Sequence, residues 1–235
     1  MDLFTTFNIK KFKHEISDEL GLWTNYLPNN CFEALNNTLN TVKQARQNKI
    51  VYPHDSEIFR VFKIIERPED IKVVIIGQDP YYNGNANGLA FGCRVDISES
   101  LKQIVHAIRV DTQTKKPIHL ESGIDLEYLA KQGVFLLNTI LTVEQGKPMS
   151  HGKIGWQNFT KSVIEAITKN NPKAIFMLWG KEAHQVDVLL GAKNPTMKTT
   201  HPASASYNKT QWKCSHFSLV NKLLVEQGKS PIVWF

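Results

Sequence analysis

The sequence contains three short apolar runs in which hydrophobic residues follow one another without alternation, at 73–77, 134–138 and 174–180. Strands buried on both faces have this pattern, and they occur mainly in parallel sheets. A weaker candidate for a fourth strand lies at 196–200. The runs therefore predict a central parallel sheet rather than a sheet with one face in water.

Four stretches carry apolar residues at helical spacing, and Ser98 and Ser100 are suited to cap the second of them. Strands and helices alternate from about residue 72. The predicted fold class is α/β, with a central four-stranded parallel sheet flanked by helices. The apolar positions are Phe32, Leu35, Leu39 and Val42; Leu101, Ile104, Val105 and Ile108; Phe159, Val163 and Ile167; and Leu219, Val220, Leu223 and Leu224.

No repeat, low-complexity stretch or linker interrupts the chain, so residues 1–235 are predicted to form a single domain. Within it, residues 1–48 are expected to form a helical N-terminal segment, which is not assigned as a separate domain. The formal net charge of +6 and the pI near 9.1 favour a polyanionic partner, although many basic proteins bind no nucleic acid.

The three cysteines, Cys31, Cys93 and Cys214, are far apart and form no C-x-x-C pair. This spacing suggests neither a zinc ribbon nor an iron–sulfur cluster, and unpaired thiols are typical of a reducing compartment. The N-terminus has no apolar signal core, and the apolar runs are far shorter than the ~20 residues of a membrane helix. We expect a soluble cytoplasmic protein.

Polar residues follow the predicted strands, and ligands of parallel sheets bind beyond the carboxyl ends of the strands. Asp79, Asn138 and His201 hold three of these positions. Each alone is more often a turn or cap residue. Because the ends open on one rim, they are together expected to place a carboxylate, an amide and an imidazole in one cleft.

The stretch 84–88 (Gly-Asn-Ala-Asn-Gly) is similar to a phosphate-binding loop, which leaves a nucleotide-binding α/β enzyme as an alternative. It has neither the G-x-G-x-x-G spacing nor the lysine of a P-loop. This alternative also explains none of the polar strand ends.

Several motifs resemble those of the family 1 uracil-DNA glycosylases. Residues 77–81 read Gly-Gln-Asp-Pro-Tyr, like the water-activating motif of that family, and 88–91 resemble its uracil-stacking segment. Residues 136–143 resemble the uracil-reading strand, and His201-Pro202 begins a segment similar to the H-P-S-P-L-S loop. Two further features fit the motifs of the family: the pairs Ser150-His151 and Gly155-Trp156, and the C-terminal residues 230–234. The resemblance covers roughly residues 49–235.

The resemblance implies a DNA-repair enzyme that hydrolyses the N-glycosidic bond of uracil in DNA, in base excision repair. Asp79 would orient or deprotonate the attacking water and stabilise an oxocarbenium-like sugar. A neutral His201 would donate to uracil O2 as negative charge develops on the leaving base. The resemblance implies no metal and no organic cofactor.

The implied substrate-binding residues are Gln78, Tyr81, Phe91 and Asn138. Phe91 would stack on a uracil that has been flipped out of the DNA. The Asn138 amide would accept from N3–H and donate to O4, and cytosine reverses this pattern. Tyr81 would stand against C5, where thymine carries a methyl group.

The resemblance also implies DNA-binding residues. Ser100 and Ser206 match serines that contact phosphates, and His151 matches a basic residue near the same groove. For each of these, a cap or a solvated loop residue is an equally good interpretation. The expected partners are uracil-containing single- and double-stranded DNA and a proteinaceous glycosylase inhibitor, and the protein is expected to be a monomer.

The chain departs from the family pattern mainly in its DNA-handling loops. Tyr82 and Asn87 each stand where the family has histidine, and Ser98-Glu99 replace a pair of prolines. In the loop 201–206, the leucine that enters the DNA stack is replaced by Ala205. Tyr207, two positions on, is large enough to take its place, so both residues are candidates for the wedge.

Two further alternatives follow from these departures. The altered loop is compatible with a glycosylase-fold DNA-binding or processivity subunit that has no activity, although a scaffold has no need of Asp79, Asn138 and His201 together. A glycosylase of a related branch that acts on mismatched thymine is disfavoured. That branch typically has asparagine where Asp79 stands and lacks the blocking Tyr81.

Overall fold

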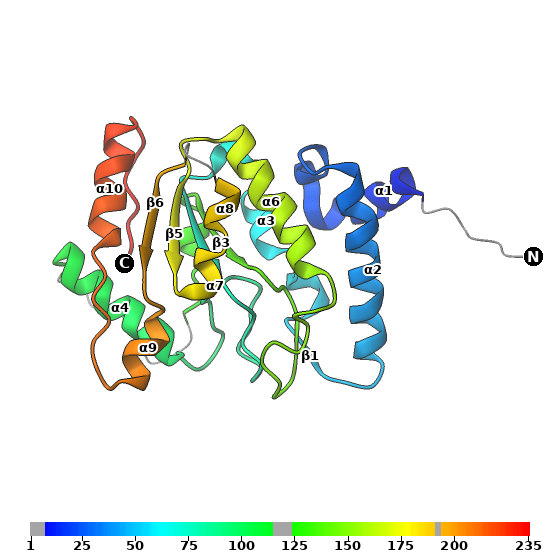
Figure 1. Cartoon of the computed structure of the whole chain (residues 1–235), viewed down its shortest axis with the longest axis horizontal. Helices are drawn as coiled ribbons and strands as arrows, with labels where there is room; N and C mark the ends of the chain where they lie inside the picture. Colours follow the sequence, from blue (N-terminus) through cyan, green and yellow to red (C-terminus); the bar gives the residue numbers. More distant parts are fainter. Residues whose placement is uncertain (1–7, 115–123, 191–193) are drawn as a thin grey trace, which may run out of the picture.

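The computed structural model describes residues 8–114, 124–190 and 194–235. Its centre is a parallel sheet with the strand order β3-β2-β5-β6 (Figure 1). Every residue of β2 and β5 is buried, whereas the edge strand β6 is largely half-exposed. The sheet confirms the four predicted strands, and their bounds are β2 Val73–Gly77, β3 Val134–Asn138, β5 Ile175–Trp179 and β6 Thr196–Thr199.

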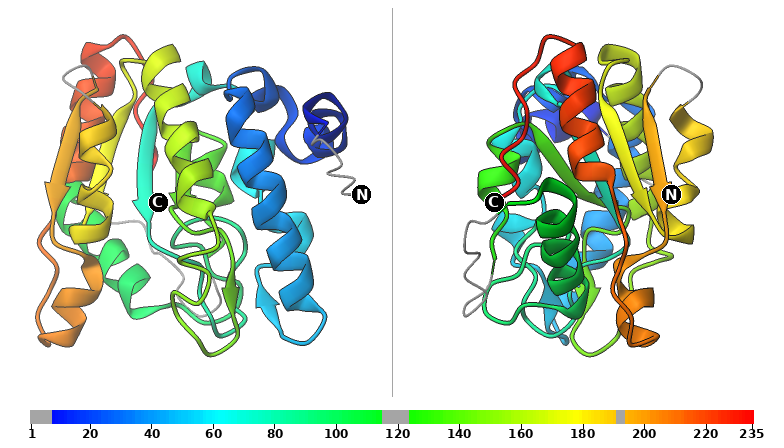
Figure 2. Two further views of the ribbon diagram at one scale, coloured as in Figure 1. Left: turned by 45° about the vertical axis from the view of Figure 1, so that its right-hand side comes forward. Right: turned by 90° about the vertical axis from the view of Figure 1, so that its left-hand side faces the viewer.

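Helices cover both faces of the sheet (Figures 1 and 2). The helix α4 packs against α10 on one side, and α6 packs against α8 on the other. The shorter α5 contacts β3, α7 contacts β5, and α9 follows the carboxyl end of β6 and packs against α4. The bounds are α4 Glu99–Thr112, α5 Glu127–Ala130, α6 Trp156–Asn170, α7 Lys181–His184, α8 Asp187–Leu190, α9 Pro202–Tyr207 and α10 His216–Glu226.

The N-terminal part adds a helical layer to this core. The helix α2 (Asn29–Arg46) packs against α6, and α1 (Ile9–Leu20) packs against α2 and α3 (Arg60–Ile64). Three short 3₁₀ helices lie at Gly21–Asn25, Asp55–Glu57 and Pro68–Asp70. Within the described ranges, no helix has the length and apolar character needed to cross a membrane.

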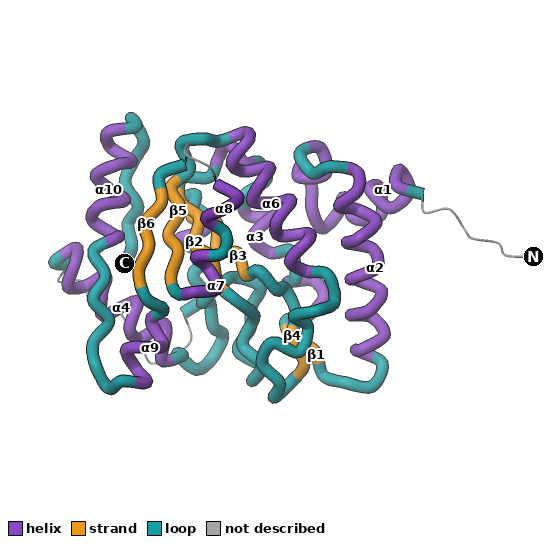
Figure 3. Tube along the Cα trace, viewed as in Figure 1, coloured by secondary structure: helices purple, strands orange, loops and turns teal. Residues whose placement is uncertain are grey.

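An antiparallel pair of two-residue strands, β1 (Val51–Tyr52) and β4 (Val143–Glu144), was not predicted from the sequence. Figure 3 shows this pair apart from the main sheet, below the carboxyl ends of its strands. Strands of two residues are too short to produce a readable periodicity. The pair joins the loop between β3 and α6 to the segment that follows α2.

Two helical predictions are corrected at single residues. The Ser98 side chain caps α4 by accepting the Leu101 N–H, whereas Ser100 lies in the first turn. In α10 the buried positions are Phe217, Val220 and Leu224, and Leu219 is 44% exposed. The true stripe begins at Phe217, which places Leu219 on the solvent side of the helix.

Candidate active site

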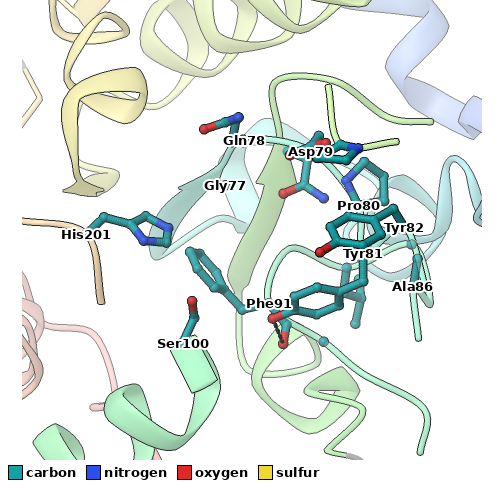
Figure 4. Close-up of a pocket in the computed structure, with 15 residues that line it drawn as sticks. Gly77, Gln78, Asp79, Pro80, Tyr81, Tyr82, Ala86, Phe91, Ser100 and His201 are labelled. Carbon is teal, nitrogen blue, oxygen red and sulfur yellow. Dashed lines mark hydrogen bonds between the residues drawn. The ribbon is translucent and has the colours of Figure 1, made fainter. Parts of the chain in front are cut away.

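A cavity lies at the carboxyl ends of β2 and β3 (Figure 4). His201 projects into it from one wall, and Tyr81 and Tyr82 lie on the opposite wall. Among the described lining residues, Asp79 is the only carboxylate and His201 the only imidazole. The structure thus brings Gln78, Asp79, Tyr81, Phe91, Ser100, Asn138 and His201 around one cavity.

Asp79 lies two residues after the end of β2 and is followed by Pro80. Proline cannot continue the hydrogen bonding of the strand, so the chain turns here. Its Oδ2 accepts the backbone N–H of Met149 at 2.7 Å. Burial raises the pKa of the Asp79 carboxyl above its ordinary value, and the hydrogen bond from Met149 partly opposes this shift. The result is a carboxylate that is held in place and partly desolvated, as a general base requires.

His201 is the N-cap of α9, and its Nδ1 accepts the backbone N–H of Ala203 at 3.1 Å. A backbone N–H can only donate, so Nδ1 carries a lone pair and Nε2 carries the proton of the neutral ring. Burial lowers the pKa of His201, which favours this neutral form at neutral pH. The site therefore holds an imidazole that can donate through Nε2 without carrying a charge.

Asn138 ends β3 and is the only residue of that strand that is not fully buried. Its partner across the sheet is Gly77, the last residue of β2. A Cβ atom at Gly77 would lie 2.0 Å from the Asn138 Oδ1. Glycine at this position therefore leaves room for the amide to reach the cavity.

Phe91 lies in the cavity wall with a backbone φ of 65°, a left-handed conformation that is rare for an aromatic residue. Its ring centroid is 5.6 Å from that of Trp179 and 6.0 Å from that of His201. Strained backbone of this kind persists where the surroundings hold it, and it is common at binding sites.

A network around Asn87 holds the segment that carries Phe91. The Asn87 side chain accepts the Leu89 N–H and donates to the Asp125 carbonyl, both at 3.1 Å. Arg60 donates to the Asn87 carbonyl at 3.1 Å and pairs with the Asp125 carboxylate. Asn87 stands where the family has histidine, and its side chain is bonded at both the oxygen and the nitrogen.

Tyr81 extends from the loop after β2, and its phenol oxygen lies 2.5 Å from the Ser98 Oγ. Burial raises the pKa of Tyr81 to about 12, against a smaller lowering by the hydrogen bond to Ser98. The phenol therefore stays protonated and neutral at physiological pH. Gln78 contributes its backbone carbonyl to the turn, where it accepts from the Thr139 hydroxyl and the Ile140 N–H.

Sequence reasoning did not find three supporting contacts of this site, namely those made by Met149, Ser98 and Asn87. Met149 acts through its backbone, so its side-chain type carries no signal. Ser98 was predicted only as a helix cap, and Asn87 was noted only as a departure from the family pattern.

Four residues were expected to contact DNA, and the structure places them differently. Ser100 lines the cavity. Ser206 is half-buried, and within the described residues its Oγ has no hydrogen-bond partner. His151 is only 3% exposed and its Nδ1 is bonded to the Thr142 hydroxyl at 2.7 Å. This burial does not support the expected phosphate contact of His151.

Ala205 is only 7% exposed within α9, whereas Tyr207 is 89% exposed at the end of the same helix. A buried methyl group is not available to enter a base stack. The structure thus corrects the expectation of a DNA contact at Ala205 and favours Tyr207 of the two candidates for the wedge.

The glycine-containing loop 84–88 does not lead into a helix, as a phosphate-binding loop would. The Asn85 side chain instead accepts the backbone N–H groups of Val95 and Asp96 and closes the loop. In the part of the chain that the structure describes, no group of three or more His, Cys, Asp or Glu residues is arranged to hold a metal ion.

Fold and cavity together define an α/β protein with a carboxylate, an amide and an imidazole around one cavity at the carboxyl ends of a parallel sheet. A family model described as the uracil DNA glycosylase superfamily matches residues 65–225. A uracil-DNA glycosylase of Buchnera aphidicola subsp. Acyrthosiphon pisum (strain Tuc7) is 43% identical over 203 residues, which are 85% of this chain and 90% of the relative. The uracil-DNA glycosylase of Saimiriine herpesvirus 2 (strain 11) is 38% identical over 223 residues, which are 90% of this chain and 87% of the relative. The chain therefore belongs to the uracil DNA glycosylase superfamily.

Solved structures share the fold. The crystal structure of mimivirus uracil-DNA glycosylase superposes with a TM-score of 0.77 at 22% identity, covering 97% of this chain and 89% of that one. A variant of mimivirus UNG in complex with UGI superposes with a TM-score of 0.79 at 22% identity, covering 97% of this chain and 91% of that one. The arrangement of sheet and helices is thus that of the solved members of the family.

Proposed function

We propose that this protein removes uracil from DNA by hydrolysing the N-glycosidic bond between the base and deoxyribose. The observation that carries the proposal is the meeting of Asp79, Asn138 and His201 with the Phe91 ring around one cavity. Membership of the family and the names of the curated relatives support the same activity.

In the proposed mechanism, the bond from C1′ to uracil N1 lengthens and positive charge develops on the sugar. The Asp79 carboxylate stabilises this charge and accepts a proton from the attacking water, whose oxygen forms the new bond to C1′. The bonding electrons leave with the base. The Nε2–H of His201 donates to uracil O2 and stabilises the negative charge there.

The pocket is proposed to select uracil by hydrogen bonding and by shape. The Asn138 amide accepts from N3–H and donates to O4, so cytosine would leave both groups of the amide mispaired. The Tyr81 ring stands at C5 and excludes the thymine methyl group. Phe91 stacks on the base face, and its place in the cavity wall, beside the rings of Trp179 and His201, supports this role.

DNA binding is proposed to require a flipped nucleotide, because a stacked and paired base cannot reach the cavity. Ser100 at the cavity wall is the proposed phosphate contact, and the buried Oγ of Ser206 in α9 does not support a second one. The solved complex of mimivirus UNG with UGI supports a proteinaceous inhibitor as a second partner of the protein.

The direct test is release of free uracil from single-stranded and duplex oligonucleotides that contain one labelled uracil. The wild-type protein should release uracil, and oligonucleotides with thymine or cytosine at the same position should remain intact. Binding of the DNA without release would overturn the proposal in favour of a non-enzymatic DNA-binding subunit.

A further inference from the structure

The phenol of Tyr81 is tied to the start of helix α4. Its oxygen lies 2.5 Å from the Ser98 Oγ and 3.5 Å from the Phe91 carbonyl oxygen. The Ser98 bond is the shorter of the two and joins side chains 17 positions apart in the chain. The second bond is at the outer limit of a hydrogen bond, so Ser98 is the main anchor of the ring.

Ser98 uses its single hydroxyl for two contacts. Its oxygen accepts the Leu101 N–H at 3.1 Å, which caps α4, and the same oxygen is paired with the phenol. The N-cap geometry restricts the Ser98 side chain, because the hydroxyl must face the first turn of the helix. The cap therefore determines where the phenol oxygen can lie.

The anchor is a departure from the family pattern, because Ser98-Glu99 stand where the family resemblance places two prolines. Proline has no side-chain hydroxyl and cannot make this bond. In α4, Ser100 follows two positions later and lines the same cavity as Tyr81. Ser98 thus links the wall of the base pocket to the helix start that faces the proposed DNA backbone.

We propose that Ser98 is a positioning residue for base selection, which holds the Tyr81 ring against C5 of the bound base through the bond between the two hydroxyl oxygens. The proposal rests on the proposed function. Without the bond the ring can turn away, and a pyrimidine with a larger group at C5 can enter. Ser98 itself does not contact the reacting atoms.

The test compares release of uracil and of 5-bromouracil from single-stranded oligonucleotides. Ser98→Gly removes the hydroxyl but keeps a residue that is tolerated at an N-cap. The kcat/KM ratio of 5-bromouracil to uracil should rise about fivefold or more, the effect of losing one hydrogen bond. Ser98→Thr should restore the wild-type ratio, because threonine keeps the hydroxyl and also caps helices.

Two further variants separate base selection from helix capping. Tyr81→Phe removes the other partner of the bond, so it should relax the ratio similarly, and the double variant with Ser98→Gly should add no further change. Asn8→Ala removes the cap of α1, where Asn8 accepts the Lys11 N–H, and should leave the ratio unchanged.

The inference is overturned if Ser98→Gly lowers uracil release while the ratio stays at the wild-type value, which would make Ser98 only a helix cap. Additive effects of Ser98→Gly and Tyr81→Phe would also overturn it. Absence of uracil release by the wild-type protein would instead overturn the proposed function, so the two failures are distinguishable.

Discussion

The Asp79 carboxylate accepts the backbone N–H of Met149 at 2.7 Å, although the two residues are 70 positions apart in the chain. The loop that carries Met149 is held near its base by the β1–β4 pair. This hydrogen bond restricts rotation of the carboxylate. The loop after β4 therefore supplies the orientation that the proposed general base needs.

Asp79→Asn should lower turnover of uracil-containing DNA by ~10²–10⁴-fold, the usual contribution of a positioned acid or base. The asparagine oxygen can still accept from Met149, so the fold and the DNA affinity should be nearly unchanged. Single-turnover kinetics and a binding titration on the same oligonucleotide would measure both. Turnover near the wild-type rate would remove Asp79 from the mechanism.

The pH profile should report the same carboxylate. Burial raises the pKa of Asp79, and its charged form is the proposed base, so activity should fall as the pH drops through this raised value. Burial lowers the pKa of His201, so the ring is neutral at any pH at or above the ordinary histidine pKa. The acid limb of kcat/KM should therefore lie above the ordinary aspartate pKa of 3.8 and be absent from Asp79→Asn. A wild-type limb at the ordinary value would contradict the burial argument.

Base preference should shift when the pocket is altered. Asn138→Asp should weaken uracil release, because a carboxylate cannot donate to O4, and it should admit cytosine, whose amino group can donate to the carboxylate. Tyr81→Ala should raise thymine release by about tenfold or more, the discrimination that one methyl group supports. Release assays with all three pyrimidines measure both changes. If neither variant changes its preference, the pocket assignment is incorrect.

Tyr207→Ala should reduce kcat/KM on duplex DNA by about tenfold or more and leave the single-strand rate nearly unchanged, because a wedge offsets an unstacking cost of a few kcal/mol. The matched variant is Ala205→Leu, at a buried position of the same helix. It should lower thermal stability by overpacking rather than raise duplex activity. A selective gain of duplex activity in Ala205→Leu would restore Ala205 as the wedge.

Activity at low substrate concentration should fall steeply with salt. The protein carries a formal charge of +6, and each phosphate that it neutralises releases counterions. The logarithm of the DNA association constant should fall with log salt with a slope of about −0.9 per contacted phosphate on duplex DNA. Titrations at several salt concentrations measure this slope, and a flat response would exclude phosphate contacts as the source of affinity.

The sheet and the content of the cavity were predictable from the sequence. Continuous apolar runs predicted β2, β3 and β5, and the shared direction of parallel strands predicted that Asp79, Asn138 and His201 would meet. The β1–β4 pair was not predictable, because strands of two residues show no period. In α10 the predicted buried stripe wrongly included Leu219, because two offset stripes fit the same apolar residues.

The sequence by itself determined the α/β order of elements and which polar residues reach the carboxyl ends of the strands, because the period of apolar residues encodes which side of each element is buried. Tertiary structure alone decided that Met149 holds Asp79 and Ser98 anchors Tyr81. It also decided that His151 and Ala205 are buried, while Tyr207 is exposed. These contacts depend on where loops return in space, and neither residue type nor spacing along the chain specifies that path.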